Sequence, residues 1–190
     1  IRRHTGTDFA NNHGWTESSI LPTGLVKAQF YVEYVICDQD HNYSLVCGTN
    51  GLFMSTNDFG DVNLVAGGTS SSKLAGYPTC ATFGATDNSY IAVGTSGNAI
   101  YYSQDGASSF TKSTSAIGGT PTAICTDSSN QIVYAAVSGS KKFVRSTDGG
   151  VTFTAPATNL PALNYNAVAT SGRVVFLGND FGVLYSLDSG

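Results

Sequence analysis

Five aspartates are the side chains of this sequence whose type and position could do chemistry. Two carboxylates can together hydrolyse a glycosidic bond, one as the acid and the other as base or nucleophile. The candidates are Asp38, Asp40, Asp87, Asp127 and Asp180. Each lies in a short polar stretch, such as D-Q-D-H-N, T-D-N or T-D-S-S-N, where aspartate commonly forms a tight turn. We favour the turn-forming role and keep the carboxylate pair as the alternative, so no catalytic residue is assigned.

Other motifs for catalysis or ligand binding are absent from the sequence. No serine stands in G-x-S-x-G, and no G-x-x-x-x-G-K-[ST] phosphate-binding loop occurs. The histidines, which show no metal-ligand spacing, are His4, His13 and His41. We therefore expect no metal and no cofactor.

The four cysteines contain no C-x-x-C pair, which speaks against zinc binding and thiol–disulfide exchange. Cys80 and Cys125 each precede a glycine, Gly94 or Gly139, by 14 residues, and we expect both to be buried strand residues. Cys37 and Cys47 flank a predicted turn. They could form a disulfide across a hairpin, but we favour free thiols.

Composition restricts the fold class. Charged residues are 12% of the 190 residues, about half the usual share of roughly 25%. Glutamate occurs only at Glu17 and Glu33, which excludes a helical bundle or coiled coil. The 41% of hydrophobic residues, including 10 Tyr and 10 Phe, can build a core and excludes a disordered chain. No apolar run reaches the roughly 18 residues of a membrane span, so a soluble all-β protein is expected.

The net charge indicates which partners to expect, and the start of the sequence indicates whether the chain has been processed. The net charge is −4, and the basic doublets are Arg2-Arg3 and Lys141-Lys142, so nucleic acid is not an expected partner. The sequence begins with Ile1 and carries no signal-peptide or lipidation pattern. We expect a processed product or a fragment.

An internal repeat dominates the sequence. Four segments superimpose: 46–55 (VCGTNGLFMS), 93–103 (VGTSGNAIYYS), 137–146 (VSGSKKFVRS) and 177–186 (LGNDFGVLYS). Each predicts the end of a strand, a glycine-containing tight turn and an apolar strand that ends at a serine, which we call the closing serine. The closing serines are 48, 43 and 40 residues apart, which is typical of a β-propeller blade built from several short strands.

A second pattern, S-x-D-x-G-x-T-F/W, follows the closing serines. Its complete copy comprises Ser146, Asp148, Gly150, Thr152 and Phe153. A partial copy comprises Ser103, Asp105 and Phe110, and another comprises Ser186, Asp188 and Gly190. After Ser55 the pattern is degraded, with Asn57 or Asp58 for the aspartate and Leu64 for the aromatic residue. The stretch from Asp8 through Trp15-Thr16 matches Asp148 through Phe153-Thr154, with two extra residues in the turn.

These residues resemble the Asp-box, or bacterial neuraminidase repeat, of β-propellers. That family includes sialidases, xyloglucan hydrolases, Vps10/sortilin receptors and photosystem II assembly factors. The resemblance spans nearly the whole chain and implies a propeller or propeller segment of about four blades, each with four antiparallel strands. It also implies that the box residues have structural roles on outer hairpins, away from the central ligand face.

The repeat divides one β-propeller domain or fragment, residues 1–190, into approximate units. These are 1–29 (a partial blade), 30–76, 77–119, 120–162 and 163–190 (incomplete). The fourth strands of the second and third complete units are expected at 109–112 and 152–155. A strand near 15–18 could supply the missing strand of the last unit and close the ring, but we favour a piece of a longer propeller.

Tyrosines and turn aspartates are the candidates for a ligand face. Tyr101 and Tyr102 are adjacent in a predicted strand, so their side chains should point to opposite faces. Exposed tyrosines can stack on sugars or anchor a protein partner, although packing between blades is the more usual role. The candidate ligand-face residues are Asp38, Asp87, Asp127, Tyr101 and Tyr102.

The leading functional hypothesis is a non-enzymatic binding or assembly module, secreted or on a virion surface, which recognises a glycan or a protein. Further copies, or the remainder of a longer chain, are additional expected partners. Sialidase chemistry is not expected, because the family's arginine triad cannot be assigned among Arg2, Arg3, Arg145 and Arg173. The alternatives are a fragment of an Asp-box glycoside hydrolase and an intracellular assembly factor.

Overall fold

The computed structural model describes residues 2–4, 15–17, 33–156 and 159–190, and every described element is a β-strand. A two-stranded hairpin comes first, formed by β1 (Arg2–His4) and β2 (Trp15–Glu17). Four antiparallel sheets follow along the chain, and in each the strands lie in sequence order. The prediction of an all-β chain built from four repeated units of short strands is confirmed.

The first two sheets have four strands each. The first sheet contains β3 (Tyr34–Ile36), β4 (Ser44–Gly48), β5 (Gly51–Ser55) and β6 (Asn63–Ala66). The second sheet contains β7 (Pro78–Phe83), β8 (Ile91–Thr95), β9 (Ala99–Ser103) and β10 (Thr111–Lys112).

The third and fourth sheets have three strands each. The third sheet contains β11 (Gly119–Thr126), β12 (Val133–Gly139) and β13 (Phe143–Ser146). The fourth sheet contains β14 (Tyr165–Ser171), β15 (Val174–Asn179) and β16 (Gly182–Ser186).

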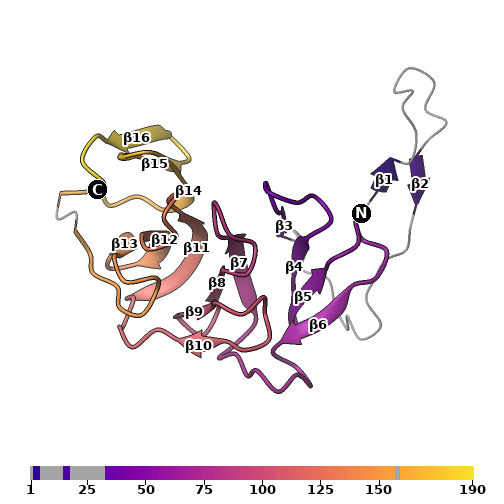
Figure 1. The fold of residues 1–190 in the computed structure, drawn as a ribbon. Coiled ribbons are helices and arrows are strands. Elements are labelled where there is room, and N and C mark those ends of the chain that lie inside the picture. The colour runs from indigo at the N-terminus through magenta and orange to yellow at the C-terminus, as the bar shows by residue number, and fades with distance from the viewer. Residues whose placement is uncertain (1, 5–14, 18–32, 157–158) are drawn as a thin grey trace.

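The four sheets are arranged as a fan, with the first strand of each sheet on the inner side (Figure 1). Strand β7 contacts β3 and β11, and β11 in turn contacts β14. The hairpin β1–β2 lies beyond the first sheet, at the opposite end of the fan from β16 (Figure 1). Since β2 pairs with β1, the expected closing strand near Trp15 does not join the fourth sheet in this structure.

The outermost strands of the second and third sheets are shorter than predicted. The strand expected at 109–112 is reduced to Thr111–Lys112. The strand expected at 152–155 is a single bridge between Arg145 and Thr154. Asp148 holds the Thr152 backbone and hydroxyl inside the preceding turn, and Pro156, which lacks an N–H donor, follows soon afterwards. Strand pairing with β13 is therefore confined to the residues between Thr152 and Pro156.

The core consists of apolar side chains packed between neighbouring sheets. Ile91 and Val93 of the second sheet pack against Leu45 and Leu52 of the first. All four cysteines are free thiols. Cys80 is buried, as expected, whereas Cys125 is only partly buried. Cys80 pairs with Gly94 and Cys125 with Tyr134, so the two cysteines are not at equivalent positions.

The pairing registers define which residues are equivalent in the four sheets. The closing serines Ser55, Ser103, Ser146 and Ser186 pair with Ser44, Ile91, Val133 and Val175, respectively. Each of these partners begins, or nearly begins, the second strand of its sheet. Positions counted back from the closing serine, or forward from its partner, can therefore be compared directly between sheets.

Candidate functional site

The repeated turn after each closing serine, which we call the serine turn, has the same hydrogen bonds to the serine hydroxyl in all four sheets. In the third sheet, Ser146 Oγ donates to Asp148 Oδ1 at 2.7 Å and accepts from the Gly150 N–H at 2.9 Å. Asp148 Oδ1 accepts from the Thr152 N–H at 2.9 Å, and Asp148 Oδ2 accepts from the Thr152 hydroxyl at 2.5 Å. Asp105 makes the same bonds with Ser109.

Two consecutive residues in each serine turn have positive φ, whether or not they are glycine. In the second sheet they are Gly106 and Ala107, at 66° and 71°. In the first sheet they are Asp58 and Phe59, at 55° and 59°. Alanine and phenylalanine therefore adopt the strained conformation that glycine adopts in the complete copy. In each sheet the serine hydroxyl accepts the N–H of the second of these residues, which stabilises this conformation of the turn.

The first sheet has the same serine turn, but different side chains form its hydrogen bonds. Asn57 takes the aspartate position, because its Oδ1 accepts from Ser55 Oγ and from the Asp61 N–H. Its amide donates to the Asp61 carboxylate at 3.0 Å, so donor and acceptor are exchanged relative to Asp148 and Thr152. This register places Val62, rather than Leu64, at the position of the aromatic residue.

Two of the turn carboxylates, Asp105 and Asp148, have lowered pKa values. Hydrogen bonds from the Ser109 side chain and backbone and from Ser103 lower the pKa of Asp105 below its usual range. Desolvation opposes ionisation of Asp148, but hydrogen bonds from Thr152 and Ser146 outweigh it and lower that pKa as well. Both carboxylates are exposed, so the shifts arise from the turn geometry rather than from a buried catalytic environment.

Acid should weaken these turns. A carboxyl group whose pKa is lower in the folded state adds stability above its unfolded pKa of about 3.9, and this stability is lost as the pH falls through the folded value. We expect the free energy of unfolding to fall between about pH 5 and pH 3. Asp105→Asn should reduce the fall, whereas the neighbouring Gln104→Ala should leave it unchanged. Urea unfolding at several pH values measures this, and identical pH profiles for the two variants would contradict it.

Each serine turn is also hydrogen-bonded to the turn between the first two strands of its own sheet. The N–H groups of Asp58, Gly106, Gly149 and Ser189 donate to the carbonyls of Asn42, Ser89, Gln131 and Arg173, at 2.8–2.9 Å. The serine turns thus hold these turns, which we call the inner turns and which contain Asp38, Asp40, Asp87 and Asp127.

A pocket of about 290 Å³ opens where the inner strands of all four sheets meet, and we call it the axial pocket. Its walls include Ile36 from β3, Phe83 from β7, Thr126 from β11 and Thr170 from β14. Asp38 contributes a carboxylate to the lining. The pocket therefore combines apolar walls, backbone edges and hydroxyl groups with a single carboxylate among its lining residues.

The structure distributes four of the candidate aspartates between two roles, whereas Asp180 lies in the hairpin between β15 and β16 and accepts a hydrogen bond from the Asn166 amide at 3.0 Å. Asp40, Asp87 and Asp127 each accept a hydrogen bond from the backbone N–H two residues later, at 3.0, 2.8 and 3.2 Å, which is an Asx turn. Asp38 lies just before such a turn and faces the axial pocket. The sequence pattern could not separate Asp38 from Asp40, because both lie in D-Q-D-H-N.

The two tyrosines lie away from the axial pocket. Tyr101 is buried, and its hydroxyl accepts the Ala75 N–H at 2.9 Å. Tyr102 is partly buried and packs against the core between the second and third sheets. Sequence reasoning missed Gln39 and Cys125, which do line the pocket. Their position at the ends of inner strands is the signal that could have identified them.

The surroundings of two lining residues, Gln39 and Cys125, determine the role that each can have in the pocket. The Gln39 amide donates to the Ala85 carbonyl, which links the inner turns of the first two sheets. Burial and the nearby charge of Asp127 raise the pKa of Cys125 to about 12, so this thiol stays protonated and is a poor nucleophile at neutral pH.

No group of three or more metal-ligating side chains occurs in the part of the chain that the structure describes. No helix in that part is long and apolar enough to cross a membrane.

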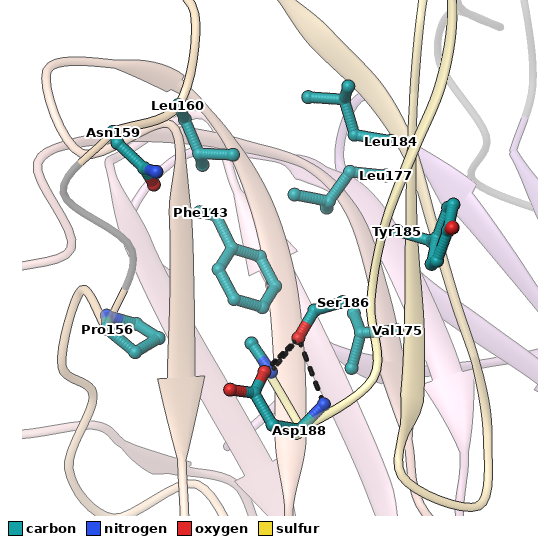
Figure 2. Close-up of a pocket in the computed structure, with 11 residues that line it drawn as sticks. Phe143, Pro156, Asn159, Leu160, Val175, Leu177, Leu184, Tyr185, Ser186 and Asp188 are labelled. Atoms are coloured by element: carbon teal, nitrogen blue, oxygen red, sulfur yellow. Dashed lines mark hydrogen bonds between the residues drawn. The ribbon is translucent and has the colours of Figure 1, made fainter.

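A second hollow, of about 470 Å³, lies between the third and fourth sheets. Figure 2 shows Phe143, Leu177, Leu184 and Val175 around it, with Ser186 and Asp188 at one edge. We call it the terminal groove. Its lining is apolar at the base and carries the fourth serine turn on its rim.

Comparisons with known proteins give the fold. No family model and no curated protein matches the sequence significantly. Among solved structures, the chain is similar to a GH74 enzyme of Niastella koreensis, with a TM-score of 0.67 and 20% identity over 87% of this chain and 24% of that one. It is also similar to the GH74 xyloglucanase from Xanthomonas campestris, with a TM-score of 0.58 and 14% identity over 83% of this chain and 27% of that one.

A third similar structure is YCF48 bound to D1 peptide, with a TM-score of 0.57 and 12% identity over 78% of this chain and 47% of that one. The chain spans about a quarter of the length of the two GH74 structures and about half of YCF48. At these identities the similarity shows the fold alone. The predicted fold class is confirmed: the chain is an all-β propeller segment of four antiparallel sheets.

Proposed function

We propose that this chain is a non-enzymatic binding module on an Asp-box propeller scaffold, and that its axial pocket takes a glycan or an extended peptide. The observation that carries the proposal is the pocket lining, in which Asp38 is the one carboxylate among the described residues. Hydrolysis of a glycosidic bond needs two carboxyl groups on opposite sides of that bond. A single carboxylate among hydroxyl and backbone groups is suited to hydrogen bonding of a neutral, polar ligand.

The serine turns support the Asp-box assignment, since in the second and third sheets the aspartate accepts hydrogen bonds from the preceding serine and from a following hydroxyl group. They lie on the outer side of each sheet, after its third strand, which suits structural rather than catalytic roles. The low charge and the polar, uncharged loops suit a secreted or virion-surface protein, and we propose that localisation.

A fragment of a glycoside hydrolase is the second candidate, because two of the similar structures are GH74 enzymes several times longer than this chain. In that case a second carboxylate would come from elsewhere in the longer protein. An intracellular assembly factor is a further alternative, and the likeness to YCF48 bound to D1 peptide favours a peptide ligand in that case.

The test uses arrays of β-glucan, sialoside and peptide probes, followed by calorimetry with the strongest binder. We expect binding without release of reducing sugar. Asp38→Asn should weaken binding about tenfold or more, because a hydrogen bond to a charged group contributes about 1.5–3 kcal/mol. Asp180→Asn, in the hairpin between β15 and β16, is the matched control and should bind normally. Sugar turnover that is lost in Asp38→Asn would replace this proposal with the hydrolase.

A further inference from the structure

Ser44 carries a buried hydroxyl at a position that is apolar in the other three sheets. It pairs with the closing serine Ser55, as Ile91, Val133 and Val175 pair with their own closing serines. All four of these side chains are buried, and Ser44 is 0% exposed. The Ser44 hydroxyl forms no hydrogen bond with any residue that the structure describes.

An unpaired hydroxyl at this position lowers stability. Burial removes the hydroxyl from water, and no described protein group replaces the hydrogen bonds that it loses. If the first sheet needed only a small side chain here, alanine would fit without this cost. Buried polar groups without partners are rare in native proteins, and each requires an explanation. The packing of the folded chain does not explain the hydroxyl of Ser44.

The residues just before Ser44 supply an explanation. Asn42-Tyr43-Ser44 is the N-x-S/T acceptor pattern for N-linked glycosylation, and it occurs nowhere else in the 190 residues. The transferase recognises the asparagine together with the hydroxyl two residues later. Since Ser44 is buried in the fold, this recognition must take place on the unfolded chain, where the hydroxyl is accessible.

Asn42 is well placed to carry a glycan after folding. It is exposed in the inner turn of the first sheet, and its Nδ2 donates a hydrogen bond to Asp40 Oδ1 at 2.9 Å. A sugar replaces only one of the two hydrogens on this nitrogen, so the bond to Asp40 can remain. The Asn42 backbone is held independently, because its N–H donates to Asp40 and its carbonyl accepts the Asp58 N–H.

An open hollow of about 470 Å³ lies beside Asn42. Only polar residues line it: Asp38, Gln39, Asp40, His41, Asn42 and Asp58. Their carboxylate, amide and imidazole groups can form hydrogen bonds with the hydroxyl and acetamido groups of a first sugar residue. Asp38 and Gln39 also line the axial pocket, so a glycan on Asn42 would stand at the rim of that pocket.

We propose that Asn42 accepts an N-linked glycan when the chain passes through a secretory pathway. The proposal rests on the proposed secreted or virion-surface localisation, and not on ligand binding at the axial pocket. The Asn42 amide nitrogen forms a bond to C1 of a lipid-pyrophosphate-linked oligosaccharide. The bond between C1 and the pyrophosphate oxygen breaks, the nitrogen loses one proton, and the lipid pyrophosphate leaves.

The test uses the 190-residue chain, directed into the secretory pathway of a eukaryotic cell by a cleavable signal peptide. The secreted chain should have a mass above 19.7 kDa. An amidase that removes N-linked glycans should eliminate the added mass and convert Asn42 to aspartate, which peptide mapping detects. A secreted chain of 19.7 kDa would overturn the proposal.

Variants assign the modification to this pattern. Asn42→Ser and Ser44→Ala should both abolish the added mass, whereas Ser44→Thr should retain it. Asn42→Ser preserves the turn, because Ser89 stands at the equivalent place and its N–H bonds to Asp87 in the same way. The matched control is Asn88→Ser in the inner turn of the second sheet, which lies outside the pattern and should keep the added mass. A glycan that persists in Asn42→Ser would contradict the assignment.

The chain made in bacterial cytoplasm, without a glycan, separates modification from folding. Ser44→Ala should lower the equilibrium constant for unfolding about fivefold, the ratio that corresponds to about 1 kcal/mol. Ser55→Ala, on the paired residue, should raise it, because the Ser55 hydroxyl accepts the Phe59 N–H. Urea denaturation measures both. If Ser44→Ala raised the constant, the hydroxyl would have a structural role and the proposal would be overturned.

The chain purified from its natural source tests the localisation separately. A glycan on Asn42 of that chain would support both proposals. An unmodified natural chain, together with a modified secreted chain, would overturn the proposed localisation alone.

Discussion

Replacement of Phe153 by alanine is expected to lower the free energy of unfolding by about 3–5 kcal/mol. The ring is 3% exposed and packs between the second and third sheets, in a cluster with Tyr90, Ile117 and Val133. Its removal would leave a cavity bounded by strands of both sheets, which are held by their own hydrogen-bond ladders and can collapse only partly. Urea denaturation monitored by circular dichroism measures the loss.

Phe181→Ala is the matched control for this change. Phe181 is 85% exposed in the hairpin between β15 and β16, so its removal should change stability by no more than about 0.5 kcal/mol. If the two variants differed by less than about 1 kcal/mol, the packing of Phe153 between sheets would not have the importance that we give it.

Ser146→Ala is expected to have the second-largest effect, a loss of about 2–4 kcal/mol. The hydroxyl is 1% exposed and accepts the N–H groups of Asp148 and Gly150, at 3.2 and 2.9 Å, while it donates to the Asp148 carboxylate. Alanine would leave the buried Gly150 N–H without an acceptor and would release the carboxylate from one of its donors. Thermal and urea unfolding both report this loss.

Thr147→Ala, one residue away and exposed, provides the control for Ser146→Ala. It should be nearly neutral, since the Thr147 side chain takes no part in the turn bonds described above. Ser186→Ala should cost less than Ser146→Ala, because the fourth serine turn is more exposed. Equal effects of Ser146→Ala and Thr147→Ala would show that the hydroxyl does not stabilise the turn.

The sequence predicts the repeated unit well, because the residues that determine it lie close together in the chain. A glycine-containing hairpin and a closing serine determine the second and third strands, and the structure places them close to the predicted residues. The outermost strands of the second and third sheets were predicted less well, because their pairing depends on which residue first leaves the serine turn. Thr152 carries a strand-forming side chain, yet its N–H and hydroxyl are bound to Asp148.

Other features depend on neighbouring sheets and could not be read from one unit. The choice of Asn57 over Asp58 follows from the partner Asp61, which stands where the pattern has threonine. The burial of Tyr101 depends on the Ala75 backbone, and the exposure of Asp38 depends on how four inner strands converge. The departure of Ser44 from the apolar residues of the other sheets becomes evident only when equivalent positions of all four sheets are compared.

The hydrogen bonds between serine turns and inner turns have a consequence for recognition at the axial pocket. Each inner turn is bound from outside to the serine turn of its own sheet, through the N–H of the first of the two left-handed residues. Loops that are fixed before a ligand arrives do not lose conformational freedom when it binds, so less of the contact energy is offset by ordering. The outer turns would thus contribute to affinity and selectivity without touching the ligand.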